Sequence, residues 1–263
     1  NTSFAGNETG TTVTLNPGSY TVDETADSAY AKTLGADCSG SIALGETKTC
    51  TITNDDKAVG LTLVKNLIKD NGGTANVTDW TLKAVGTGGA PTNLSGVTGS
   101  DGATSGANFK ADTYTLSETG GPSGYISQGW SCTNGVTVSP NSTITLVNGQ
   151  STICTVTNND DTPALTLVKK LGETYGSNVN VSAWTLTATG TLNPATNISG
   201  KTGTPQATSG SNFKADTYTL GESGPSGFTA SWSCKNNVTG AIATVTAPLA
   251  IALGQNYTCT ATN

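Results

Sequence analysis

Apolar and polar residues alternate along several short segments of the chain, which is the pattern of half-buried β-strands. Successive side chains of a strand point to opposite faces, so residues two positions apart share a face. Three such faces are apolar and end in a polar residue: Leu61, Leu63 and Lys65; Tyr114, Leu116 and Glu118; and Cys154, Val156 and Asn158. The pattern predicts an all-β chain in which each of these strands carries one polar side chain at the end of a buried face.

The same segments recur at a regular spacing. The sequence YTLSETGGPSGY at 114–125 returns as YTLGESGPSGF at 218–228 and, more loosely, as YTVDETADSAY at 20–30. Each copy precedes a closing segment, which reads CTITN at 50–54, CTVTN at 154–158 and CTATN at 259–263. Because 104 residues separate Asn54 from Asn158 and 105 separate Asn158 from Asn263, each repeat has the length of a whole domain.

The third repeat carries the three faces again: Leu165, Leu167 and Lys169; Tyr218, Leu220 and Glu222; and Cys259, Ala261 and Asn263. The first repeat has the equivalents Glu24 and Asn54, but it contains neither an opening LTLVK strand nor a WTL strand. A sandwich without these strands has unpaired edges that a stable secreted protein must cover. We expect upstream sequence of a longer parent protein to supply them, and strands donated by a neighbouring subunit are the alternative.

Two acidic runs, NDDKAVG at 54–60 and NNDDTPA at 158–164, separate a closing strand from an opening one and are interpreted as short linkers. They divide the chain into an incomplete module at 1–57 and full modules at 58–161 and 162–263. The pairs Asp55–Asp56 and Asp160–Asp161 offer oxygen ligands for Ca²⁺ at these junctions, although a solvated linker is the favoured interpretation because a Ca²⁺ site needs about six oxygens.

Composition narrows the classes of function. The chain has 263 residues, a net charge of −6 and no histidine or methionine, and charged residues make up 11% of it. Without histidine the commonest general base and neutral metal ligand are missing, so we expect neither enzymatic activity nor a cofactor. Without a basic stripe we expect no nucleic-acid partner, and without a long apolar run we expect no membrane span in this segment.

Six cysteines fall two to a repeat. An even count with one pair per repeat predicts the disulfides Cys38–Cys50, Cys132–Cys154 and Cys234–Cys259, and hence an oxidising compartment. The four tryptophans at 80, 130, 184 and 232 occupy equivalent positions in the two full repeats, which favours a place in the core over an exposed glycan platform.

Three recurring motifs resemble those of the SpaA-type, prealbumin-like (CnaB-like) β-sandwich modules of bacterial surface proteins and pilins. They are an opening strand that ends in Lys, a Y-x-L-x-E segment followed by P-x-G-Y or a similar turn, and a closing strand that ends in T-N. The resemblance covers both full repeats and the incomplete one. It implies an all-β fold of tandem Ig-like/prealbumin-like β-sandwich domains joined by short acidic linkers.

In that family the lysine and asparagine can form an intramolecular isopeptide bond with the help of the acidic residue. By motif position, the resemblance implies Lys65, Glu118 and Asn158 in one module and Lys169, Glu222 and Asn263 in the next, with Glu24 and Asn54 as a partial set. The plainer alternative is a Lys–Glu pair that is hydrogen-bonded to the asparagine. The cysteine pairs depart from the usual pilin pattern, so a disulfide in place of the isopeptide bond is a further alternative.

Together these features predict a secreted, extracellular or cell-surface structural protein of a bacterium. Its modules would form a stalk, a surface layer or a pilus-like filament, with copies of the same protein as partners. The alternative is an adhesin whose modules bind a glycan or a host protein.

Overall fold

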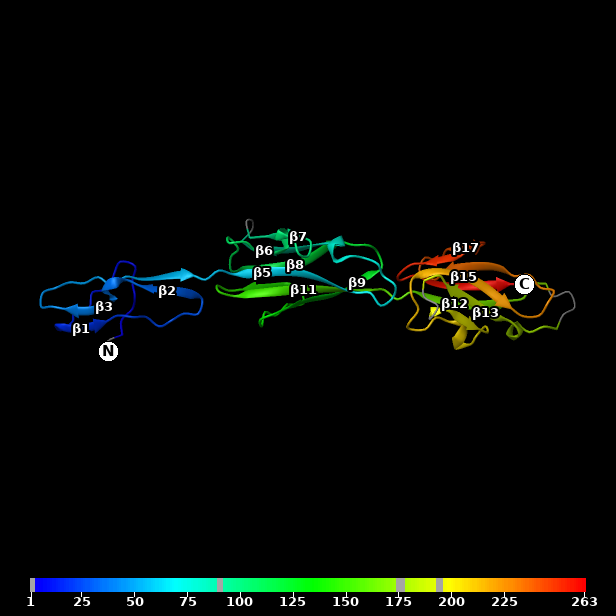
Figure 1. Ribbon diagram of the computed structural model, residues 1–263, viewed down its shortest axis with the longest axis horizontal. Coiled ribbons are helices and arrows are strands. Elements are labelled where there is room, and N and C mark those ends of the chain that lie inside the picture. Colours follow the sequence, from blue (N-terminus) through cyan, green and yellow to red (C-terminus); the bar gives the residue numbers. More distant parts are fainter. Residues whose placement is uncertain (1–2, 89–91, 174–177, 193–195) are drawn as a thin grey trace.

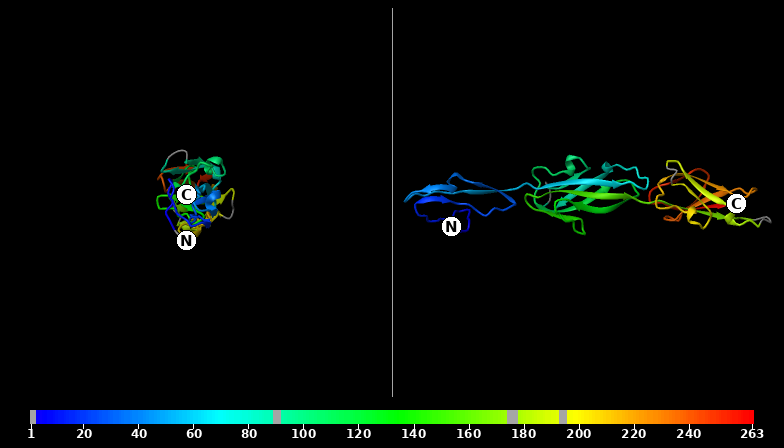
Figure 2. Two further views of the ribbon diagram at one scale, coloured as in Figure 1. Left: turned by 90° about the vertical axis from the view of Figure 1, so that its left-hand side faces the viewer. Right: turned by 60° about the horizontal axis from the view of Figure 1, so that its bottom comes forward.

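The computed structural model describes residues 3–88, 92–173, 178–192 and 196–263, which form β-strands and three-residue 3₁₀ turns. Its three units follow one another in a row, with the two-layered second and third units after a thinner first one (Figures 1 and 2). Every sheet is built from strands of a single repeat.

The second unit is a sandwich of two sheets whose strand orders are β5-β11-β9 and β10-β8-β6-β7. Its strands are β5 (Gly60–Ile68), β6 (Trp80–Gly86), β7 (Leu94–Gly96), β8 (Asp112–Gly120), β9 (Tyr125–Cys132), β10 (Thr143–Leu146) and β11 (Ser151–Asp160). The 3₁₀ turns η2 (Val77–Asp79) and η3 (Asp101–Ala103) connect some of them. Apolar side chains from both sheets meet in one core, in which Leu63, Leu82, Tyr114 and Val156 are fully buried.

The third unit repeats this arrangement with the strand orders β12-β19-β16-β17 and β14-β13-β15-β18. Its strands are β12 (Ala164–Lys170), β13 (Thr185–Gly190), β14 (Ile198–Gly200), β15 (Asp216–Ser223), β16 (Ser231–Asn236), β17 (Ile242–Val245), β18 (Leu249–Ile251) and β19 (Asn256–Thr262). Its 3₁₀ turns include η4 (Val181–Ala183) and η6 (Pro205–Ala207). A second core of its own contains Leu167, Leu186 and Tyr218. The all-β, tandem-sandwich prediction is confirmed for both full repeats.

The first unit consists of two strand pairs, β1 (Gly18–Thr21) with β3 (Ser39–Ile42) and β2 (Tyr30–Leu34) with β4 (Ile52–Asp56). The 3₁₀ turn η1 (Ala36–Cys38) precedes β3. Within residues 3–57, Cys38 is the one buried apolar residue, and Leu34 and Leu44 are exposed. The unit therefore has no core comparable with those of the other two.

The first and last strands of each full unit lie side by side and run parallel. In the second unit β5 pairs with β11 from Gly60↔Ser151 to Ile68↔Asn159. In the third unit β12 pairs with β19 in the same way. Because parallel strands cannot be joined by a tight hairpin, the rest of each unit forms the connection between them.

The linkers are shorter than the acidic runs suggest. β4 continues through Asp56 and β11 through Asp160, so only residues 57–59 and 161–163 lie between strands of successive units. The interpretation of the acidic runs as solvated linkers is wrong for Asp160, whose side chain is buried.

Candidate functional site

A buried lysine–glutamate pair bridges the two sheets of the second unit. Lys65 lies on the inward face of β5 after Leu61 and Leu63, and its side chain has no exposed surface. Its Nζ donates a hydrogen bond to Oε2 of Glu118, on β8 of the opposite sheet, at 2.6 Å. The indole of Trp80 lies beneath the ammonium, with 4.8 Å between Nζ and the ring centroid.

The third unit has the same lysine–glutamate pair, and here the asparagine is hydrogen-bonded to the glutamate. Lys169 Nζ donates to Glu222 Oε2 at 2.7 Å and lies 5.0 Å from the centroid of the Trp184 ring. The side-chain amide of Asn263 donates to the other carboxylate oxygen, Glu222 Oε1, at 2.7 Å. One carboxylate therefore contacts both the amine and the amide.

The asparagine reaches the pair through the parallel register. Lys65 is opposite Val156 on β11, and Asn158 follows two residues later on the same buried face. Lys169 is opposite Ala261, and Asn263 follows at the same offset. The amide oxygens of Asn158 and Asn263 are both buried and accept no hydrogen bond, so each amide has an acceptor without a donor.

Burial disfavours the charged form of Lys65. Burial lowers the pKa of this lysine from its usual 10.5, and the hydrogen bond and charge of Glu118 act in the opposite direction. Burial therefore favours the neutral amine, which is the nucleophilic form. A neutral amine, a carboxyl group that can take up or donate a proton, and an amide with an unpartnered oxygen are together the components of an acyl transfer.

The tryptophans do not all behave as predicted. Trp80 and Trp184 are core residues, as predicted, and they also form the floor beneath the lysine amines. Trp130 and Trp232 are only partly buried at the edge of the core, so the core prediction is only partly correct for them. A side chain at Gly121, where φ is +80°, would collide with the Trp80 indole, so the turn after β8 fits this ring closely.

In the first unit the partial set is not assembled. Glu24 lies just beyond β1, and Asn54 is exposed on β4, whereas the equivalent Asn158 is buried. Lys32, on β2 opposite Asn54, instead forms an ion pair with Asp23 and donates to the backbone carbonyl of Glu24 at 3.0 Å. The sequence predicted no lysine partner in this unit, because the unit has no opening strand that ends in lysine.

Each unit of the structure holds one disulfide: Cys38–Cys50, Cys132–Cys154 and Cys234–Cys259. In the full units the two cysteines are direct cross-strand neighbours, on β9 and β11 and on β16 and β19. The lysines lie on β5 and β12, on the other side of the closing strands. The disulfides therefore join the closing strands to β9 and β16, on the side away from the lysines, and leave the lysine–glutamate–asparagine sets in place.

The four aspartates at the junctions have different roles in the structure. The carboxylate of Asp160 accepts hydrogen bonds from the backbone N–H groups of Asp70, Asn71 and Gly73 and so fixes the turn after β5. Asp55 and Asp56 are exposed on β4, and Asp161 is partly exposed. Within the described ranges no three His, Cys, Asp or Glu side chains cluster as metal ligands. No helix in the same ranges has the length and apolarity to cross a bilayer.

Comparisons with known proteins identify the family of the two full repeats. The family model SpaA_2, "Prealbumin-like fold domain", matches residues 55–156 and 160–261. A search of curated protein sequences found no match.

Solved structures similar to the chain include a major pilin protein (T3.2) from Streptococcus pyogenes, with 14% identity, a TM-score of 0.39 and coverage of 78% of this chain and 96% of that one. The Bacillus anthracis TIE protein has 13% identity and a TM-score of 0.40, and 82% of this chain and 47% of that one are covered. The pilus adhesin SpaC from Lactobacillus rhamnosus GG has 16% identity and a TM-score of 0.40, with coverage of 89% and 34%. Because the family model matches both full repeats, the chain belongs to the SpaA-type family of prealbumin-like fold domains.

Proposed function

We propose that the chain is part of an extracellular structural protein of a bacterial surface, whose modules form a stalk or pilus-like filament and are locked by internal isopeptide bonds. The bonds would join Lys65 to Asn158 and Lys169 to Asn263. One observation carries the proposal: both full units bury a lysine–glutamate pair, and on the strand next to the lysine an asparagine two residues further along has a buried amide oxygen without a hydrogen-bond donor. A buried charged pair by itself adds little stability, so its repetition beside such an amide favours a chemical role.

The reaction requires no cofactor. Glu118 takes the proton of the Lys65 ammonium, and the resulting carboxylic acid donates a hydrogen bond to the amide oxygen of Asn158. The amine lone pair attacks Cγ of Asn158, a new C–N bond forms, and the Cγ–Nδ2 bond breaks. As the new bond forms, the attacking amine loses one of its two protons to the leaving nitrogen, which departs as ammonia, and Glu118 keeps the proton that it took from the ammonium. Each module reacts once, so this is a self-modification rather than turnover.

The position of the bond suits a load-bearing module. The chain enters the second unit at β5 and leaves it at β11, and these two strands are neighbours. A covalent bond between them would carry tension from the entry strand to the exit strand. The residues between Lys65 and Asn158 would then not be stretched, which is the property that a stalk or filament subunit needs.

Intact mass spectrometry of the purified chain tests the proposal. We expect the mass to be lower than the sequence mass, with the disulfides counted, by one ammonia for each of the two bonds. Glu118→Ala should abolish one loss and Glu222→Ala the other. Glu46→Ala is the matched control, because Glu46 pairs with Lys48 at the surface of the first unit and should leave both losses intact. An unmodified mass of the parent chain would show that the pairs are only structural.

A further inference from the structure

The opening strand of each full unit lies at the edge of its sheet. β5 is the end strand in the order β5-β11-β9, and β12 has the same place in the third unit. The ladder with β11 therefore covers one side of β5, and the backbone groups on the other side need partners from elsewhere. Lys65 lies on this strand, so the segment that covers the free side also holds the backbone of the lysine.

The loop at 97–105 covers this free side, and we call it the clasp. The Leu61 N–H donates to Ser105 Oγ at 2.9 Å, and the Ser105 N–H donates back to the Leu61 carbonyl at 2.8 Å. Four residues further along β5, the N–H of Lys65 donates to Thr98 Oγ1 at 2.6 Å. The clasp thus holds the lysine at its own backbone, in addition to the ladder with β11.

The clasp of the third unit, at 201–209, makes the same contacts. The Lys169 N–H donates to Thr202 Oγ1 at 2.5 Å, and Leu165 and Ser209 exchange the corresponding two bonds at 3.0 and 2.8 Å. In both clasps the residue pair T-G is followed by A-T-S, but the three residues between them differ, S-D-G in one and T-P-Q in the other. Both units therefore contact the lysine backbone with a threonine hydroxyl, although the loop sequences differ.

The local fold of the clasp determines where the threonine hydroxyl lies. The Ser100 N–H donates to the Val97 carbonyl at 3.0 Å. Thr98 and Gly99 are therefore the central residues of a turn, and the φ of +82° at Gly99 is typical of a type II turn. The turn packs closely on the end of β7, because a side chain at Gly96 would approach Ser100 Oγ to 2.5 Å. Thr98 is thus presented to β5 by a short turn that rests on the opposite sheet.

We propose that Thr98 and Thr202 are positioning residues for the crosslinking reaction, which rests on the proposed function. Each accepts the backbone N–H of its lysine and so fixes the direction in which the lysine side chain leaves the strand. The Nζ atom is at the end of a flexible four-carbon stem, so a small rotation of the backbone moves the amine by a larger distance. The amine must come within about 3–3.5 Å of the asparagine Cγ, and a misplacement of about 1 Å can lower the rate about a hundredfold.

A purely structural hydrogen bond would not have this effect on the rate. Its loss would lower the stability of the unit, but a unit that remains almost entirely folded would still react at the parent rate. The two bonds of the clasp separate these roles, because each removes one hydroxyl acceptor from the same strand. Ser105 holds β5 four residues before the lysine, whereas Thr98 holds the lysine itself.

The test follows ammonia loss in the freshly refolded 263-residue chain, and the crosslinked peptides of the two units are quantified after proteolysis. Thr98→Val keeps a side chain of similar shape but removes the acceptor, and it should slow formation of the Lys65–Asn158 bond at least about tenfold. The bond of the third unit should form at the parent rate in the same molecule. Thr98→Ser, which restores the hydroxyl, should react at close to the parent rate. Thr202→Val should slow the bond of the third unit instead.

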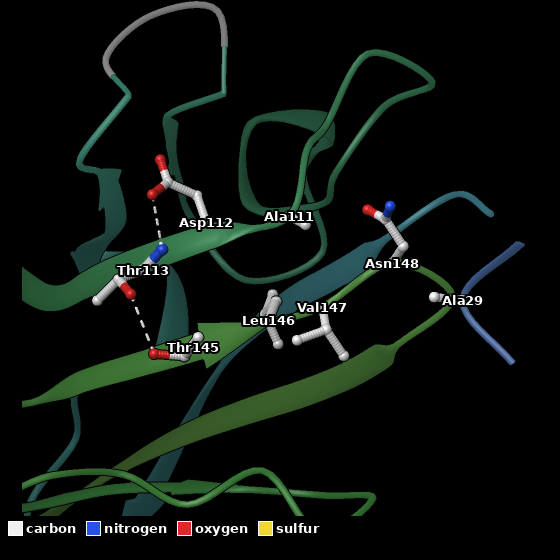
Figure 3. Close-up of a pocket in the computed structure, with 8 residues that line it drawn as sticks. All are labelled: Ala29, Ala111, Asp112, Thr113, Thr145, Leu146, Val147 and Asn148. Atoms are coloured by element: carbon white, nitrogen blue, oxygen red, sulfur yellow. Dashed lines mark hydrogen bonds between the residues drawn. The ribbon is translucent and has the colours of Figure 1, made fainter. Parts of the chain in front are cut away.

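Thr113→Val is the matched control, because it removes a threonine hydroxyl that joins two strands of the same unit outside the clasp. This hydroxyl lies 3.0 Å from the Thr145 hydroxyl on β10, at the edge of a pocket of about 440 Å³ (Figure 3). Ser105→Ala is the second control, since the N–H of this residue keeps its bond to the Leu61 carbonyl. Both controls should react at the parent rate. Thr98→Val should keep the pH dependence of the parent, because Thr98 bonds to a backbone N–H rather than to an ionisable group.

Three outcomes would overturn the positioning role and leave the proposed function intact. One is a parent-like rate in Thr98→Val, and another is an equal delay in Ser105→Ala or Thr113→Val. The third is a Thr98→Ser variant as slow as Thr98→Val. A parent chain that loses no ammonia would overturn the proposed function and the positioning role together.

Discussion

Removal of Glu118 leaves a buried lysine without its counter-charge, and the cost can be worked out from the structure. The experiment uses a chain that carries Asn158→Ala, so that no crosslink can form in either the reference or the variant. In this background Glu118→Ala removes the carboxylate 2.6 Å from Lys65 Nζ. The ammonium retains the Trp80 ring at 4.8 Å but no carboxylate, and its side chain has no exposed surface.

The folded state can respond in two ways, and both are unfavourable. Breaking a buried ion pair by removing one partner costs about 3–5 kcal/mol. Deprotonation of a lysine whose usual pKa is 10.5 costs about 4.8 kcal/mol at pH 7, and this value is the upper limit of the destabilisation. We therefore expect Glu118→Ala to lower the free energy of unfolding of the second unit by about 3–5 kcal/mol at pH 7.

The lowered pKa of Lys65 sets the sign of the pH dependence. Burial lowers the pKa of Lys65, so between that lowered value and 10.5 the unfolded state binds more protons than the folded state. Stability must then rise with pH in this range, by about 1.4 kcal/mol per pH unit for one proton. Raising the pH from 7 to 9 should therefore recover part of the loss in Glu118→Ala, and at most about 2.7 kcal/mol of it.

Urea unfolding followed by hydrogen exchange measures this for each unit separately, because the second and third units have separate cores. Glu222→Ala is the matched control and should destabilise only the third unit. The double variant Glu118→Ala/Lys65→Met should return to within about 1 kcal/mol of the reference, because an apolar side chain replaces the charge. A loss below about 1 kcal/mol, or one that does not change with pH, would refute the reasoning.

Three further outcomes are expected. Replacing Cys132 and Cys154 together by serine should lower the urea stability of the second unit by about 3 kcal/mol, since the disulfide spans 22 residues. Asp160→Ala removes the acceptor of three backbone N–H groups in the turn at 70–73, and the Asn71 carbonyl of this turn accepts a hydrogen bond from the Ala215 N–H of the third unit. Small-angle scattering should therefore show a wider range of angles between the second and third units. The rate of ammonia loss in freshly refolded chain should be constant near neutral pH and fall at both lower and higher pH. The reactive form, with a neutral lysine and a protonated Glu118, holds as many protons as the ion pair, so its share of the pair does not change with pH while the pair holds that number of protons.

Alternation and repetition in the sequence placed the site residues at the ends of apolar strand faces, and the family resemblance implied that they form one set. Period-two patterns placed Lys65, Glu118 and Asn158 at the ends of apolar faces, and the structure buries Lys65 against Glu118. In the third unit one carboxylate contacts both Lys169 and Asn263. This succeeded because a strand with one buried face has a fixed register, and a shift by one residue would expose the whole face.

Interactions that depend on how loops meet strands could not be predicted. Asp160 stands in a polar run that resembles a linker, yet it is buried because the turn at 70–73, which is 87 or more residues away in sequence, supplies its donors. Repetition alone does not distinguish Trp80 and Trp184 from Trp130 and Trp232. The structure does: Trp80 lies in the core beneath Lys65, whereas Trp130 lies near the edge of the core.

The suggestion that a disulfide replaces the isopeptide bond can be tested mechanically, because the two links would respond differently to force. Cys132 and Cys154 both lie between Lys65 and Asn158 in sequence. If Lys65 and Asn158 are bonded, tension passes directly from β5 to β11, so reduction of the disulfide should not change the length of the second unit under load. In Asn158→Ala the unit should unfold under load, and reduction should then release the 22-residue separation and add about 75 Å. Single-molecule pulling with and without a reductant measures both lengths. A parent chain that lengthens on reduction as much as Asn158→Ala would show that the disulfide is the only covalent restraint in the unit.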